Sequence, residues 1–139
     1  MLSSEAEIVE QLNAATRRPY LVGIDGRSGA GKSVLADRIC QQLTDAVVVR
    51  KDDFYRMMDE AARSSLDARQ GYDRYFDWDR LRQQVLLPIA AGQTARYQRY
   101  DWTRQELAET IEVAPRRIVI VEGVYATRLE LKDFYDLRI

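Results

Sequence analysis

The stretch that decides the fold is Tyr20-Leu-Val-Gly-Ile-Asp-Gly-Arg-Ser-Gly-Ala-Gly-Lys-Ser-Val34. Residues 20–25 form a short apolar run that ends at glycines, which predicts a buried strand. From residue 32 onward apolar side chains recur every four positions, which predicts a helix over 32–43. Between strand and helix lies the pattern G-x-x-x-x-G-K-[ST], residues 26–33, and a phosphate-binding loop (P-loop) requires this context.

The chemistry of this loop follows from its residue types. Glycines let the backbone curl so that its N–H groups face phosphate oxygens, with the positive end of the following helix behind them. Lys32 is predicted to reach the β- and γ-phosphates, and the Ser33 hydroxyl to bind Mg²⁺. ATP and Mg²⁺ are therefore the expected cofactors. The candidate nucleotide-binding residues are Gly26, Arg27, Ser28, Gly29, Ala30, Gly31, Lys32, Ser33 and Val34.

The rest of the chain alternates strands with helices. Apolar runs predict strands over 46–49 and 117–121, and a last strand begins near Leu137. Helices are predicted over 3–15, 57–70, 79–91 and 127–134, and a hairpin over 94–113. In the helix over 79–91 we expect Pro88 to kink or interrupt the last turn and Gly92 to close it.

This alternation predicts an α/β fold with a mostly parallel sheet. The length of 139 residues suits one domain. We assign 1–139 to a single domain, with an N-terminal helix in 1–18 and a nucleotide-binding core in 19–139.

Composition narrows the classes of function. With 21 basic and 22 acidic residues, the net charge of −1 gives no reason to expect nucleic-acid binding. No apolar stretch approaches the ~20 residues of a membrane span, and the N-terminus does not resemble a secretion signal, so a cytoplasmic location is expected. The sequence contains no histidine, so any catalysis must use carboxylates and any metal must accept oxygen ligands.

Other nucleotide-binding classes fit less well. A GTPase would carry an Asn-Lys-x-Asp motif, but the only asparagine is Asn13, ahead of the loop. The glycines do not fit the dinucleotide-binding pattern G-x-G-x-x-G, and the Leu-Ser-Gly-Gly-Gln signature of transporter ATPases is absent.

Five motifs follow one another as in the uridine kinase-like family of P-loop kinases, which the chain resembles over residues 19–139. They are Gly26–Ser33, Asp52-Asp-Phe-Tyr55, the segment Tyr72-Asp-Arg-Tyr-Phe-Asp-Trp-Asp-Arg-Leu81, Tyr100-Asp101 and Val121-Glu-Gly-Val-Tyr125. The resemblance implies a three-layer P-loop NTPase fold of the nucleoside kinase type. It also implies ATP-dependent phosphoryl transfer to a hydroxyl of a nucleoside or similar small metabolite. The family continues into an arginine-rich lid and another helix, so the lid and the last core elements are expected to be missing here.

Three carboxylates, those of Asp52, Asp53 and Glu122, directly follow predicted strands. Ligands of open α/β sheets bind at the carboxyl ends of strands, so these groups are expected to converge beside the loop. The resemblance implies that Asp52 is the general base and that Ser33, Asp52 and Glu122 hold Mg²⁺ directly or through water. The alternatives are a solvated Asp52 paired with Lys51 or Arg50, a surface Asp53, and a Glu122 that caps the next helix.

On the acceptor side, the resemblance implies that Asp53, Tyr55, Asp73 and Tyr100 contact the substrate. Phe76-Asp77 could be aligned in place of Tyr72-Asp73, and Asp73 could instead cap the helix that contains Leu81. Packing in the hairpin is the alternative for Tyr100. Trp78 and Trp102 are interpreted as packing residues.

The uridine–cytidine kinases of the family use a histidine near the base, which this chain lacks, so the acceptor stays unnamed. The expected partner is a small-molecule acceptor, with no nucleic acid and no membrane, and self-association into a homo-oligomer is a further expectation. Two other hypotheses stay open. One is a non-catalytic or degenerate nucleotide-binding protein, or a fragment of a longer kinase, and the other is an ATPase that drives a partner.

Overall fold

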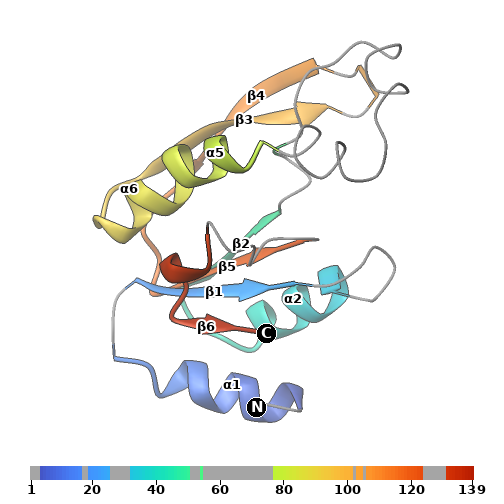
Figure 1. Ribbon diagram of the computed structural model, residues 1–139. Helices are drawn as coiled ribbons and strands as arrows, with labels where there is room; N and C mark the ends of the chain where they lie inside the picture. Colours follow the sequence, from blue (N-terminus) through green and yellow to red (C-terminus); the bar gives the residue numbers. More distant parts are fainter. Residues whose placement is uncertain are drawn as a thin grey trace.

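A computed structural model of the chain places a four-stranded parallel sheet between two groups of helices (Figure 1). It describes residues 4–16, 19–25, 32–50, 54, 77–101, 103–104, 106–123 and 131–139, and for Lys32 and Ser33 the backbone alone. The helices are α1 (Glu5–Asn13), α2 (Lys32–Gln41), α5 (Trp78–Leu81) and α6 (Leu87–Ala90), with a π-helical segment η2 (Arg82–Leu86) between the last two and a 3-10 turn η3 (Lys132–Phe134). The strands are β1 (Tyr20–Ile24), β2 (Ala46–Arg50), β3 (Ala95–Asp101), β4 (Glu106–Val113), β5 (Ile118–Glu122) and β6 (Leu137–Arg138).

The main sheet has the strand order β2-β5-β1-β6, and all its pairs are parallel. This confirms the predicted α/β class and the strands expected over 20–25, 46–49, 117–121 and near Leu137. The late strand β5 lies between the two early strands β1 and β2, which brings their carboxyl ends together at one edge.

The sheet separates two apolar cores. On β5, Val119 and Val121 join the core under α5, η2, α6 and the hairpin, whereas Ile118 and Ile120 join the core under α1 and α2. Successive side chains of a strand point to opposite faces, so a strand buried on both faces reads as an unbroken apolar run. These two cores establish the three-layer arrangement.

The helix predicted over 79–91 is present as α5, η2 and α6 in succession. Pro88 has no N–H to donate, and the chain accommodates it with a wider turn in which the Leu87 N–H bonds to the Arg82 carbonyl. The α-helical pattern is therefore interrupted before Pro88, yet the path stays helical to Ala90. Gly92, with φ of +75°, ends it as predicted.

The predicted hairpin over 94–113 is also confirmed, since β3 and β4 pair antiparallel beside α5 and α6 (Figure 1). The helix expected over 57–70 lies outside the described residues. Of the one expected over 127–134, the described part is the 3-10 turn η3. Within the described ranges, every helix is too short or too polar to cross a membrane.

Candidate functional site

The edge formed by the carboxyl ends of β1, β5 and β2 is the centre of the candidate site. Ile24 of β1 pairs in register with Glu122 of β5, and Glu122 pairs with Arg50 of β2. The chain leaves this edge after Asp25 and re-enters described structure as α2 at Lys32. The strand and helix that flank the phosphate-binding motif are therefore both present, as the sequence predicted.

Glu122 is the one buried charged residue recorded within the described part of the chain, with 2% of its surface exposed. Strand pairing holds it there, because β5 is hydrogen-bonded on both sides. The pairing extends one residue further, since the Gly123 N–H donates to the Ile24 carbonyl at 3.0 Å. Gly123 has φ of +150°, a region that favours glycine. The Glu-Gly pair thus ends the strand with its carboxylate buried at the edge.

Arg50 compensates the charge of Glu122. Its Nη1 donates to Glu122 Oε1 at 3.2 Å, and its Nη2 donates to Asp37 Oδ1 on α2 at 2.6 Å. Partial burial lowers the pKa of the Arg50 guanidinium, but the hydrogen bonds and charges of Asp37 and Glu122 outweigh this and raise the pKa above its ordinary value. The guanidinium therefore carries a permanent positive charge between two carboxylates.

Mg²⁺ suits the chemistry of the predicted ligands, because Ser33, Asp52 and Glu122 all offer oxygen donors. Of these three side chains the structure describes only that of Glu122, which reaches the edge where the motif begins. Within the described ranges, no three carboxylate or cysteine side chains gather closely enough to hold a metal. The role of Glu122 at the metal stays a prediction.

Tyr135, which precedes the last strand, is buried in the core under α5, η2, α6 and the hairpin. Burial raises the pKa of its phenol well above the ordinary value, and the charge of Asp25, the residue before the motif, raises it further. The side chain of Asp136 accepts a hydrogen bond from the Leu21 N–H at 2.8 Å, which fixes the chain after Tyr135 against β1. Tyr135 is thus a neutral, buried neighbour of Asp25.

Phe54 is the one residue of the Asp-Asp-Phe-Tyr motif that the structure describes. Its side chain is fully buried, its ring lies 4.6 Å from the Tyr97 ring of β3, and the Arg80 guanidinium lies 5.1 Å from its centroid. Its carbonyl accepts a hydrogen bond from the Asp77 N–H at 2.7 Å.

Asp77, not Asp73, caps the helix that contains Leu81, because its carboxylate accepts from the Arg80 N–H at 3.2 Å. It also pairs with Arg80 Nε at 3.7 Å. The capping alternative for Asp73 is therefore wrong, and the carboxylate of Asp77 is engaged in holding the helix. Trp78 packs partly buried against the core under α5, as interpreted from the sequence.

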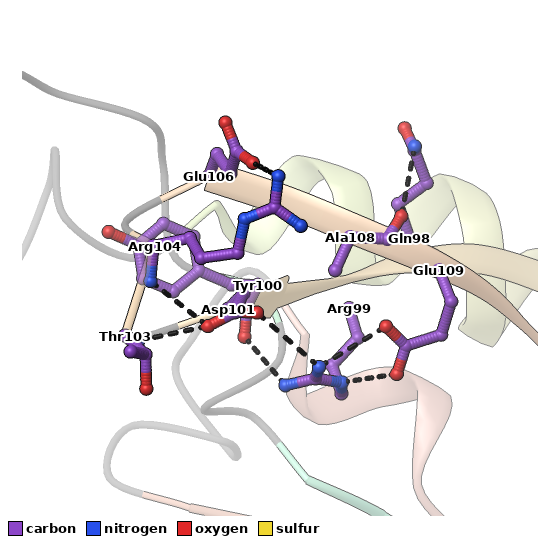
Figure 2. A network of polar contacts seen from close by, with 9 residues as sticks. All are labelled: Gln98, Arg99, Tyr100, Asp101, Thr103, Arg104, Glu106, Ala108 and Glu109. Carbon is purple, nitrogen blue, oxygen red and sulfur yellow. Dashed lines mark hydrogen bonds and ion pairs between the residues drawn. The ribbon is translucent and has the colours of Figure 1, made fainter.

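The hairpin tip carries Tyr100 and a polar network (Figure 2). Tyr100 is fully buried, so hairpin packing accounts for part of its role, and a contact with substrate stays a prediction. The Asp101 carboxylate accepts from the backbone N–H groups of Thr103 and Arg104 at 2.9 and 3.1 Å, which forms the turn. Arg99 pairs with Glu109 through two hydrogen bonds, of 2.6 and 3.2 Å.

The other predicted site residues are placed less fully. Val34, in the first turn of α2, is 60% exposed, and its contact with a nucleotide stays a prediction. For Lys32 and Ser33 the structure gives the helical backbone. The remainder lie outside the described residues: Gly26, Arg27, Ser28, Gly29, Ala30, Gly31, Asp52, Asp53, Tyr55 and Asp73.

Fold, motif context and buried edge carboxylate together define a P-loop nucleotide-binding protein. The comparison with known families agrees. The sequence profile of the phosphoribulokinase/uridine kinase family matches residues 21–139, and the chain belongs to this family.

The chain is similar in sequence to proteins with different names and similar in fold to a solved structure. The chain is 32% identical over 121 residues to "Inorganic pyrophosphatase TTM2" of Arabidopsis thaliana, which covers 86% of this chain and 17% of that protein. It is 27% identical over 121 residues to a uridine kinase of Borrelia duttonii, which covers 86% of this chain and 58% of that kinase. The chain thus spans less than two thirds of either relative. A solved structure described as a possible uridine kinase from Bacillus stearothermophilus superposes with a TM-score of 0.85 at 22% identity, covering 96% of this chain and 77% of that one, which supports the fold.

Proposed function

We propose that this chain catalyses ATP-dependent phosphoryl transfer to a hydroxyl of a nucleoside or similar small metabolite. The observation that carries the proposal is the buried Glu122 at the carboxyl edge of β5, beside the β1-to-α2 connection that contains the phosphate-binding motif. Membership of a kinase family over residues 21–139 supports it, and the relative named uridine kinase makes nucleosides the first acceptors to test.

The roles follow from what phosphoryl transfer requires. Bound Mg²⁺ neutralises charge on the β- and γ-phosphates. Lys32 binds the terminal phosphates as a point charge, and the motif backbone cradles them. Asp52 accepts the proton of the attacking hydroxyl. Glu122 and Ser33 are the remaining proposed metal ligands.

A panel of nucleosides, vitamins and sugar alcohols, incubated with Mg-ATP and read by mass spectrometry, tests the proposal. The expected result is one acceptor class that gains a phosphoryl group together with acceptor-dependent formation of ADP. An Asp52→Asn preparation purified in parallel controls for contaminating kinases.

Two other outcomes would contradict the proposal. Nucleotide binding without any phosphorylated product would favour the non-catalytic alternative. Inorganic pyrophosphate belongs in the same panel, because one relative is named a pyrophosphatase. Phosphate release from pyrophosphate, with no phosphorylated acceptor, would point to hydrolysis instead of transfer.

A further inference from the structure

Arg50 is shared unequally between two carboxylates at the candidate site. Its contact with Asp37, at 2.6 Å, is shorter than its contact with Glu122, at 3.2 Å. The two acceptors also differ in exposure, since the Asp37 side chain is 47% exposed and the Glu122 side chain 3%. One guanidinium thus connects α2, β2 and β5 at the edge where the phosphate-binding motif begins.

A buried carboxylate needs a positive charge close by, and Arg50 supplies one through its contact with Glu122. A divalent cation at Glu122 would supply the same charge. Each weakens the other's contact with the carboxylate, because like charges held close together repel. Arg50 and the cation therefore compete for Glu122. Asp37 gives the guanidinium a second acceptor on the solvent side, so Arg50 can leave Glu122 without losing all its partners.

We propose that Arg50 is a positioning residue that holds Glu122 in the metal-free chain and bonds to Asp37 alone when the metal is bound. The inference rests on the proposed function, because it takes Glu122 as a metal ligand. It goes further by assigning the exchange to two residues, Arg50 and Asp37, that ligate neither metal nor nucleotide.

The proposal predicts opposite effects for substitutions at two residues in contact. Arg50→Gln removes the competing charge, so divalent cations should bind more tightly, by roughly tenfold, within the 5–150-fold range typical of coupling between sites. Asp37→Asn removes the second acceptor and leaves Arg50 on Glu122, so cations should bind about threefold more weakly, a smaller coupling of the same kind. A merely structural role for the cluster would shift both affinities in the same direction.

The probe is Mn²⁺, measured by loss of the free-ion electron paramagnetic resonance signal at saturating ADP. Arg82→Gln is the matched control, because Arg82 and Asp79 form a similar pair at 2.8 Å with exposures of 38% and 45%, against 38% and 47% for Arg50 and Asp37. The control should bind Mn²⁺ as the wild type does. Tighter binding by Arg50→Gln with weaker binding by Asp37→Asn supports the exchange. Unchanged or parallel shifts overturn it.

Arg50→Lys keeps the inference testable if Arg50→Gln does not fold. A lysine retains the charge but cannot bridge two carboxylates as a fork, so it lacks the second acceptor that the exchange requires and should weaken Mn²⁺ binding in the same direction as Asp37→Asn. Unchanged or tighter binding by Arg50→Lys would overturn the inference. Failure of the wild type to bind Mn²⁺ and ADP would overturn the proposed function as well, whereas normal wild-type binding with shifts of the wrong sign would overturn this inference alone.

Discussion

The central sheet and the β3–β4 hairpin hold their functional residues in different ways. All five residues of β5 are buried, and its side chains pack in both apolar cores. In β3, exposed Arg96 and Gln98 alternate with buried Ala95 and Tyr97. The sheet therefore fixes Glu122 by packing on two faces. The hairpin is packed on one face, and surface ion pairs, each worth little, join its strands on the other.

The hairpin also contains an irregularity that the sheet lacks. Its register shifts between Gln98 and Tyr100, so that the single residue Arg99 of β3 stands against two residues of β4, Ala108 and Glu109. Such a bulge bends and twists a hairpin locally. The proposed nucleotide half thus lies at an edge packed on two faces, whereas the proposed acceptor half includes a hairpin packed on one face, and we expect its outer face to tolerate substitution better.

The largest effect is expected from a substitution of Asp52, which should affect phosphoryl transfer but not nucleotide binding. Asp52→Asn should lower acceptor phosphorylation by about 10²–10⁴-fold, the usual contribution of a general base. Affinity for ATP, measured by calorimetry, should stay within a few-fold, because the sheet edge and Lys32 are unchanged. Near-native turnover with a working acceptor would place the base elsewhere.

A pair of identical substitutions compares the two halves directly. Ile120→Ala, in the fully buried strand β5, should lower the free energy of unfolding by about 2–5 kcal/mol. Ile111→Ala, in the partly buried strand β4, should cost about 1 kcal/mol, since less apolar area leaves water there. Urea unfolding followed by circular dichroism measures both. Equal losses would mean that the hairpin is packed as tightly as the sheet.

The next effect concerns the nucleotide edge alone. Lys32→Ala should weaken ATP binding about 10–100-fold, or about 1.4–2.7 kcal/mol, because the lysine is the main point charge offered to the terminal phosphates. Lys132→Ala, on the 3-10 turn η3, is the control and should bind as the wild type does. Unchanged calorimetric affinity in folded Lys32→Ala would remove the basis for the phosphate-binding assignment.

The sequence predicts the sheet better than it predicts the site. Strands such as β1 and β5 are buried on both faces, so their apolar runs are visible without knowledge of their neighbours. The strand order is not visible, and it brings Arg50 to Glu122, 72 residues away. From the sequence, Arg50 could be proposed only as a partner of Asp52, and its contact with Glu122 was missed.

Two other features escaped prediction for similar reasons. An apolar residue among polar neighbours, such as Phe54, indicates a buried side chain. Its partners Arg80 and Tyr97 belong to later elements, so the sequence does not identify them. The π-helical segment before Pro88 leaves the apolar spacing intact, so periodicity indicates a helix without revealing the change of hydrogen bonding. Local sequence patterns predict helices and strands, whereas contacts between elements far apart in the chain can be identified only once the fold is known.

The smallest expected effect tests whether the outer face of the hairpin is surface electrostatics alone. The hydrogen bonds from Arg99 hold the pKa of the Glu109 carboxyl below its ordinary value. A carboxyl with a lowered folded-state pKa adds stability above its unfolded pKa and loses that contribution as pH falls through the folded value. Arg99→Gln should raise the pKa of Glu109 toward its ordinary value, as read by carbon NMR titration of the side-chain carboxyl, because the hydrogen bonds from Arg99 are the largest cause of the shift.

Arg96→Gln is the control. It removes the neighbouring ion pair with Glu112 at 3.1 Å and should leave the pKa of Glu109 unchanged. High salt should reduce the shift in the wild type, because the Debye screening length falls to ~3 Å in 1 M salt and exposed charges then interact weakly. A shift that persisted in both high salt and Arg99→Gln would mean that backbone geometry at the bulge, not the arginine, sets the pKa, and that this face of the hairpin is more firmly built than the comparison with the sheet implies.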